Sequence, residues 1–147
     1  MKIPRLTVIT LGVRNLATAT EFYRAVLSTT PNTENEGVTF IELPGVWLSL
    51  FPIEELAKDM ACNISPVRNG FTGITLAHNA RSKTEVISIM DKARAAGATV
   101  LKEPQDTFWG GFGGYFSDPD GYIWEIVWGS MFEFTQHGDL RFKSTPP

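Results

Sequence analysis

Cysteine and histidine are scarce in this chain of 147 residues, which contains one Cys and two His. A single thiol, Cys62, excludes an internal disulfide and a cysteine-rich metal cluster. The expected role of Cys62 is that of a small, unreactive side chain in a linker. The chain must therefore obtain its stability from an apolar core.

The chain also lacks an excess of basic residues and any long apolar run. Its formal net charge is −3, and its Lys and Arg residues are scattered, which argues against nucleic-acid binding. No apolar run reaches the roughly 18 residues that a membrane span needs. The start, Met1 to Arg5, has no apolar signal-peptide core, so we expect a cytoplasmic location without membrane association. A hydrophobic fraction of 43% is typical of a globular protein.

What the chain does contain is an internal repeat, which is clearest in its last third. Gly114 to Trp128 predicts two strands around an Asp-Pro-Asp-Gly turn, and Thr39 to Phe51 has a similar pattern. A shift of 76 residues carries Ser49 onto Glu125, and a shift of 67 carries the expected helix start Asn15 onto Ser82. The chain thus looks like two copies of one unit.

The two shifts differ by nine residues, and the extra residues fall in the segment 101–113. This segment contains Trp109 beside two glycines, so it combines a large aromatic surface with mobile backbone. We expect an enlarged loop there, acting either as a lid or as a dimer contact.

The repeat predicts one domain over residues 1–147, with repeats at 5–59 and 71–128, a linker at 60–70 and a C-terminal tail at 129–147. Each repeat reads as a strand, a helix and three further strands, a βαβββ unit. One such sheet is too small to bury both faces. We therefore predict an α+β fold in which two βαβββ units pair to form a cup-shaped open barrel with helices outside.

Two motifs carry a resemblance to a known family. They are Leu-Gly-Val-Arg-Asn-Leu at 11–16 followed by Glu-Phe-Tyr at 21–23, and Phe-Ser-Asp-Pro-Asp-Gly at 116–121 followed by Trp-Glu-Ile at 124–126. The chain resembles the vicinal oxygen chelate superfamily, which includes glyoxalase I, bleomycin-resistance proteins, fosfomycin-modifying enzymes and extradiol dioxygenases. The resemblance covers residues 5–128 and implies the glyoxalase-like fold, whereas one fold hosts many chemistries.

The resemblance implies four positions for a metal, one on the first and one on the last strand of each unit. The residues that match these positions are Val8, Ser49, Thr75 and Glu125. Only Glu125 is a competent ligand, whereas zinc, nickel or iron sites need about three His, carboxylate or thiolate donors. We expect no cofactor, with a divalent metal as the alternative.

The two histidines are the remaining candidates for rescuing a metal site. His78 is expected at the end of a strand, partly buried on the helix side, and His137 is expected in solvent in the tail. Whether either of them completes a site with Glu125 stays open at this point.

Period-two alternation predicts which side chains line the cup. The expected lining is apolar and aromatic with a few hydroxyls and one carboxylate, which is typical of a small-molecule site. The alternative is that these side chains simply fill the core. An inward carboxylate without a basic neighbour needs a partner, so Glu125 is the candidate acid or base, or the anchor of a ligand. The expected ligand-binding residues are Trp47, Ser49, Phe51, Thr75, Trp109, Ile123 and Glu125.

Three functions remain compatible with the sequence. The first is a homodimeric protein, similar to bleomycin-resistance proteins, that binds a small organic ligand without the superfamily metal, with or without catalysis. The second is a metal-dependent lyase or isomerase resembling lactoylglutathione lyase, or a dioxygenase. The third is a non-catalytic structural or regulatory dimer. The identity of the ligand does not follow from the sequence.

Overall fold

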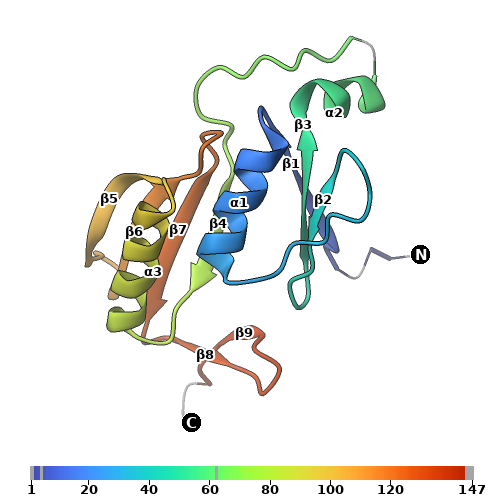
Figure 1. Cartoon of the computed structure of the whole chain (residues 1–147). Helices are drawn as coiled ribbons and strands as arrows, with labels where there is room; N and C mark the ends of the chain where they lie inside the picture. The colour runs from blue at the N-terminus through green and yellow to red at the C-terminus, as the bar shows by residue number, and fades with distance from the viewer. Residues whose placement is uncertain (1, 4, 62, 145–147) are drawn as a thin grey trace. The chain divides into compact units, whose positions relative to one another are not determined.

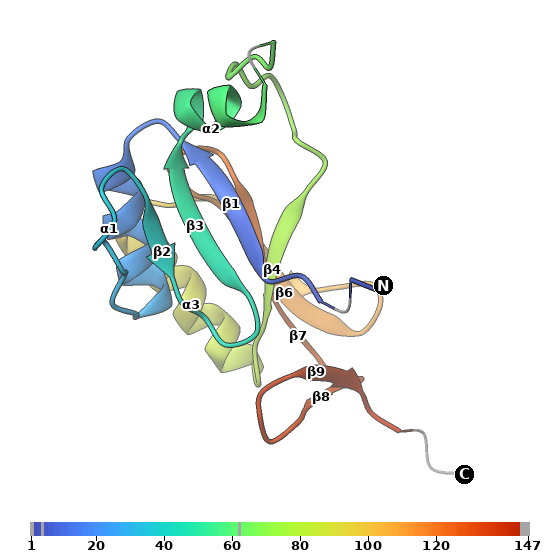
Figure 2. The ribbon, with the colours of Figure 1, turned by 90° about the vertical axis from the view of Figure 1, so that its right-hand side faces the viewer.

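The computed structural model describes residues 2–3, 5–61 and 63–144, so Cys62 lies outside the described residues. The chain forms two compact units, Met1–Gly73 (unit 1) and Ile74–Pro147 (unit 2). Figures 1 and 2 show the elements of each unit from two directions. Within the described residues, no helix has the length and apolar character that crossing a membrane would require.

Unit 1 contains one mixed sheet with two helices. Its sheet has the order β1-β3-β2, in which β1 runs parallel to β3 and β2 runs antiparallel to it. The further strand expected after the first helix is reduced to a single bridge between Asn32 and Phe40. The elements are β1 (Val8–Val13), α1 (Leu16–Leu27), β2 (Thr39–Ile41), β3 (Trp47–Pro52) and α2 (Ile53–Met60).

Unit 2 repeats this arrangement with a complete set of strands. Its sheet has the order β4-β7-β6-β5, with β4 parallel to β7 and the other neighbours antiparallel. The tail adds a separate hairpin, β8–β9. The elements are β4 (Thr75–Asn79), α3 (Lys83–Ala95), β5 (Thr99–Asp106), β6 (Gly111–Ser117), β7 (Ile123–Gly129), β8 (Phe132–Phe134) and β9 (Leu140–Phe142).

Each long helix begins at the residue that the sequence predicts. The Asn15 side chain accepts a hydrogen bond from the Thr18 backbone N–H at 2.9 Å, and the Ser82 hydroxyl accepts one from the Glu85 N–H at 3.0 Å. The Glu85 carboxylate in turn accepts from the backbone N–H of Arg81. These contacts satisfy N–H groups that have no partner within the helix.

The core of each unit lies between its long helix and one face of its sheet. In unit 1 the buried stripe of α1 faces alternate residues of β1 and β3, and Figure 2 shows α1 beside this sheet with α2 after the end of β3. In unit 2 the fully buried Phe116 stacks on Trp124 with ring centroids 6.3 Å apart, on the sheet face next to α3. On the opposite face of the unit 1 sheet, α2 packs over one end, with Ile53 and Leu56 beside Gly12.

The segment 101–113 is not the enlarged loop that the sequence predicts. Most of it belongs to β5 and β6, and the turn between them comprises only residues 107–110. Gly110 adopts φ +92°, and the Gly111 N–H donates to the Thr107 hydroxyl at 2.8 Å. Register shifts in β5 at Val100/Lys102 and Lys102/Gln105 each take up one extra residue. The strands are also longer than in unit 1, since β6 has seven residues where β2 has three. The prediction of a loop was wrong because most of the added residues pair as strand in β5 and β6.

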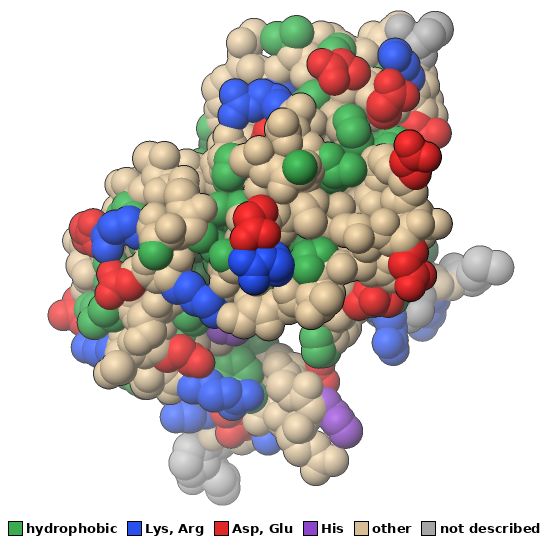
Figure 3. Space-filling view, viewed as in Figure 1, with side chains coloured by type: hydrophobic (Ala, Val, Ile, Leu, Met, Phe, Trp, Pro, Cys, Tyr) green, Lys and Arg blue, Asp and Glu red, His purple; other side chains and the backbone are tan. Residues whose placement is uncertain are grey.

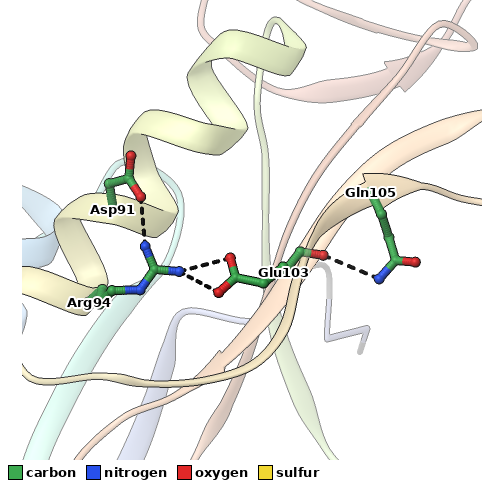
Figure 4. Close-up of polar contacts among 4 residues, drawn as sticks. All are labelled: Asp91, Arg94, Glu103 and Gln105. Atoms are coloured by element: carbon green, nitrogen blue, oxygen red, sulfur yellow. Dashed lines mark hydrogen bonds and ion pairs between the residues drawn. The ribbon is translucent and has the colours of Figure 1, made fainter.

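An exposed ion-pair network joins the irregular part of β5 to α3 (Figure 4). Arg94 donates from Nη2 to both oxygens of Glu103, at 2.6 and 2.8 Å, and from Nη1 to Asp91 at 2.8 Å. The side-chain amide of Gln105 reaches the Glu103 carbonyl at 3.4 Å. Solvent screens such a network, so its main effect is to orient β5 on the helix.

Candidate functional site

Glu125 lies on the face of the unit 2 sheet that is opposite to α3. Its neighbours along β7, Trp124 and Ile126, are buried on the helix side, so alternation turns Glu125 the other way. Across the sheet Glu125 pairs with Tyr115 of β6 and with Ala77 of β4. The carboxylate is therefore a half-buried group on an open sheet face.

The partner that this carboxylate needs is Tyr115. The Tyr115 hydroxyl donates a hydrogen bond to Glu125 Oε2 at 2.5 Å. This hydrogen bond, together with partial burial and the nearby negative charge, raises the pKa of Tyr115 to about 12. The phenol therefore stays protonated at neutral pH, and the hydrogen bond is lost only as the pH rises through about 12.

Sequence reasoning missed Tyr115, although a signal for it existed. Tyr115 and Glu125 are equidistant in sequence from Asp120, in the centre of the turn, so a simple hairpin places them opposite each other. Alternation along a single strand does not reveal this pair, which follows only when residues are matched across the hairpin.

Asp118 fixes the hairpin turn that sets this register. Its side chain is 4% exposed, and Oδ1 accepts from the N–H groups of Asp120 at 2.9 Å and Tyr122 at 2.8 Å. Gly121 takes φ +86°, a conformation that favours glycine. The turn thus holds Tyr115 and Glu125 opposite each other.

The same face of unit 2 carries three more of the predicted ligand-binding residues. Thr75 pairs with Ile123, two residues before the Ala77–Glu125 pair, so both lie on the Glu125 face. At the other end of this face, the Trp109 ring covers Gly111 and Gly129, where an added Cβ would lie 2.3 and 3.0 Å from ring carbons. Trp109 remains 38% exposed.

The other predicted residues form a group within unit 1. Trp47, Ser49 and Phe51 alternate along β3 on the face away from α1. Trp47 is 40% exposed and makes an edge contact with Phe40 at 6.1 Å, whereas Ser49 is buried. This face thus carries aromatic side chains, the buried Ser49 hydroxyl and the exposed Thr10, which pairs with Ser49.

The residues at the four metal-equivalent positions do not fit the superfamily's cation. The strand pairing agrees with the two repeat shifts. Thr10 pairs with Ser49 in unit 1, and the residues that the shifts of 67 and 76 assign to them, Ala77 and Glu125, pair with each other in unit 2. Val8, Ser49 and Thr75 supply no strong donor, which leaves Glu125. Among the residues that the structure describes, no group of three or more His, Cys, Asp or Glu side chains could hold a metal.

The histidines do not complete such a site in the described parts of the chain. His78 pairs with Ile126 and therefore belongs to the face opposite Glu125, as expected, but its side chain is exposed and the prediction of partial burial was wrong. His137 lies exposed in the β8–β9 turn, where its N–H donates to the Thr135 hydroxyl at 3.3 Å.

The chain is similar to several solved structures. A glyoxalase-related enzyme from Fulvimarina pelagi is 30% identical, with a TM-score of 0.85, over 97% of this chain and 100% of that one. A glyoxalase/bleomycin resistance protein/dioxygenase from Nocardioides is 24% identical, with a TM-score of 0.75, over 88% and 85%. Lactoylglutathione lyase from Agrobacterium tumefaciens is 23% identical, with a TM-score of 0.67, over 91% of this chain and 100% of that one. The similarity to this protein and to the Nocardioides protein shows the fold alone, because both identities are below 25%. A comparison with curated proteins finds no significant match.

A protein-family model gives the same result from the sequence side. It matches residues 5–126, which include the first repeat and all but the last two residues of the second, and end one residue after Glu125. The predicted α+β fold with two βαβββ-like units is confirmed by the match to glyoxalase-like structures. The chain belongs to the Glyoxalase/Bleomycin resistance protein/Dioxygenase superfamily.

Proposed function

We propose that this protein binds a small organic ligand on the open sheet face of unit 2, without the superfamily metal. Proteins of this superfamily bind small molecules. The observation that carries the proposal is the Tyr115–Glu125 pair, which places a half-buried, oriented carboxylate on a mainly apolar face. The face also carries Lys102, which pairs with Tyr115 across β5 and β6. Such a surface, apolar with few polar groups, is typical of small-molecule recognition.

The chemistry of the pair defines what kind of ligand it suits. Tyr115 donates to one carboxylate oxygen of Glu125, which leaves acceptor capacity for a donor or cation on the ligand. Trp109 and Ile123 offer apolar contact on the same face, and Thr75 offers a hydroxyl. The ligand class is therefore an aromatic or apolar molecule that carries a cationic or hydrogen-bond-donating group.

The same geometry would support proton transfer. An ionised Glu125 can take a proton from a ligand as a general base, while the Tyr115 hydroxyl keeps the carboxylate oriented. Glu125 is thus the proposed acid or base if the protein turns its ligand over. Trp47 and Phe51 of unit 1 remain proposed ligand-binding residues on the basis of their shared face, whereas the buried Ser49 would lie behind them.

Glu125→Gln tests the proposal. The substitution keeps the shape of the side chain and removes its charge, so we expect ligand affinity or turnover to fall about tenfold or more, which corresponds to about 1.4 kcal/mol. A thermal-shift screen of aromatic and cationic small molecules identifies a ligand, and calorimetry then measures its affinity for the parent and the variant.

Glu54→Gln is the matched control, because Glu54 is an exposed carboxylate of α2 in unit 1. It should bind the ligand like the parent. Equal affinity of the Glu125→Gln variant and the parent would refute the anchoring role of Glu125.

A metal-dependent lyase, isomerase or dioxygenase is the alternative function. It is disfavoured by the donor set, in which Glu125 is the one competent ligand of the four equivalent positions. We expect protein offered zinc, nickel, manganese or ferrous iron and then desalted to hold less than about one-tenth equivalent, as measured by elemental analysis. Stoichiometric metal that disappears in the Glu125→Gln variant would establish the alternative.

The homodimer, the cytoplasmic location and a purely structural or regulatory role stay predictions from the sequence. Exposed apolar side chains in unit 1, such as Val8 at 41% and Trp47 at 40%, are compatible with either a ligand or a second subunit.

A further inference from the structure

Unit 2 contains a cavity away from the Glu125 face, at the ends of β4 and β7 and beside the C-terminal hairpin. It is open to solvent on one side and has a volume of about 290 Å³, close to the smallest small-molecule sites. Its walls come from the connection between β4 and α3, from the end of β7 and from the β8–β9 hairpin, the last lying beyond the end of β7 in Figure 1. The lining residues include Arg81, Trp128, Phe132, Glu133, Phe134 and Lys143.

Backbone hydrogen bonds position both cations of this cavity. The Ala80 N–H donates to the Val127 carbonyl at 2.8 Å, which holds the next residue, Arg81, beside the end of β7. The Lys143 N–H donates to the Met131 carbonyl at 2.8 Å, which holds Lys143 beside the start of β8. Two cations from distant parts of the chain therefore line one cavity.

The charge in this cavity is not neutralised by its own acidic residue. Glu133 pairs with Arg141 at 2.9 Å, so it does not pair with the two lining cations. Within the described residues, the structure places no carboxylate in ion-pair contact with Arg81 or Lys143. In the lower part of Figure 3, Lys and Arg side chains lie close to Asp and Glu side chains.

The aromatic side chains give the cavity a second chemical property. The Arg81 guanidinium lies over the Phe134 ring at 4.2 Å from the centroid, an arrangement that leaves the in-plane N–H groups available to an acceptor. The Trp128 indole also lines the cavity, and Lys83 lies 5.8 Å from its centroid. A ligand therefore meets donors for an anion beside aromatic surface.

We infer that this cavity binds a small aromatic carboxylate, with Arg81 and Lys143 on the carboxylate and Trp128 and Phe132 against the ring. A planar carboxylate matches the fork of a guanidinium, and Lys143 adds a second charge. Both cations are exposed to solvent, so the affinity should be modest and should fall with added salt. The inference does not depend on the role of the Tyr115–Glu125 pair.

Benzoate and its neutral isostere benzamide test this inference by NMR titration of the isotope-labelled protein. We expect benzoate to bind with a dissociation constant of about 1 mM, and to shift the Trp128 indole and the Gly129 and Ser130 amide signals. Benzamide should bind about tenfold more weakly, because it lacks the charge that the two cations recognise. Inorganic phosphate should also bind about tenfold more weakly, because it has no aromatic ring.

Variants localise the effect. Arg81→Gln and Lys143→Gln should each weaken benzoate binding about fivefold to tenfold. The affinity of Arg81→Lys should lie between those of Arg81→Gln and the parent. The matched control Lys58→Gln should bind benzoate like the parent. Thermal melts confirm that each variant is folded. The inference would be overturned if benzamide or phosphate bound as tightly as benzoate, or if both Gln variants kept the parent's affinity. It would also be overturned if the shifts were confined to the Glu125 face, or if benzoate did not bind at about 10 mM.

Discussion

Replacing Phe116 by Ala is expected to lower the free energy of unfolding by about 4 kcal/mol. Phe116 is fully buried on the α3 side of the unit 2 sheet, and its ring stacks on Trp124 at 6.3 Å. Truncation removes the apolar surface of the ring and leaves a cavity that the sheet and helix cannot fill by small movements. Urea denaturation of the parent and the variant measures the difference.

Phe108 provides a matched control for this prediction. It is the same residue type, but its side chain is 102% exposed in the β5–β6 turn. Phe108→Ala should change the free energy of unfolding by less than about 0.5 kcal/mol. Similar losses in the two variants would show that burial of Phe116 does not account for its contribution.

Replacing Asp118 by Ala should be the second most damaging change, with a loss of about 2 kcal/mol. The substitution removes the acceptor of the Asp120 and Tyr122 N–H groups at a position that is 4% exposed. Donors left without a partner near the core lose the hydration that they have in the unfolded chain. The change in melting temperature and in urea stability measures the effect.

Asp118→Asn distinguishes the hydrogen bonds from the general effect of mutation. Its amide oxygen can still accept from the same N–H groups, so it should retain more stability than the Ala variant. Because the turn sets the register of β6 and β7, the Ala variant should also weaken ligand binding through Tyr115 and Glu125. Asn and Ala variants of equal stability would contradict the proposed role of the Asp118 carboxylate.

Much of the fold could be predicted because its signals are local. The caps at Asn15 and Ser82 and the hairpin around residues 118–121 depend on residues that are close in sequence. The two repeat offsets also agree with the observed pairing of Thr10 with Ser49 and of Ala77 with Glu125. Duplicated patterns therefore predicted equivalent positions in the two sheets.

The errors concern features that depend on contacts between distant residues. Segment 101–113 was expected to be a loop, but pairing with β6 makes most of it strand, and α3 holds its irregular part through Arg94 and Glu103. The exposure of His78 likewise depends on what packs above the end of β4, which no local pattern encodes.

By itself, the sequence determined the family, the two-unit organisation and the sheet face to which Glu125 belongs, because periodicity and turn chemistry are properties of neighbouring residues. Only the tertiary structure decided that the Glu125 carboxylate is bound by Tyr115, and that Arg81 and Lys143 line one cavity with Trp128. The physical reason is that a hydrogen bond across strands and a shared cavity depend on register and packing. These bring together residues whose separation in the sequence does not record their distance in space.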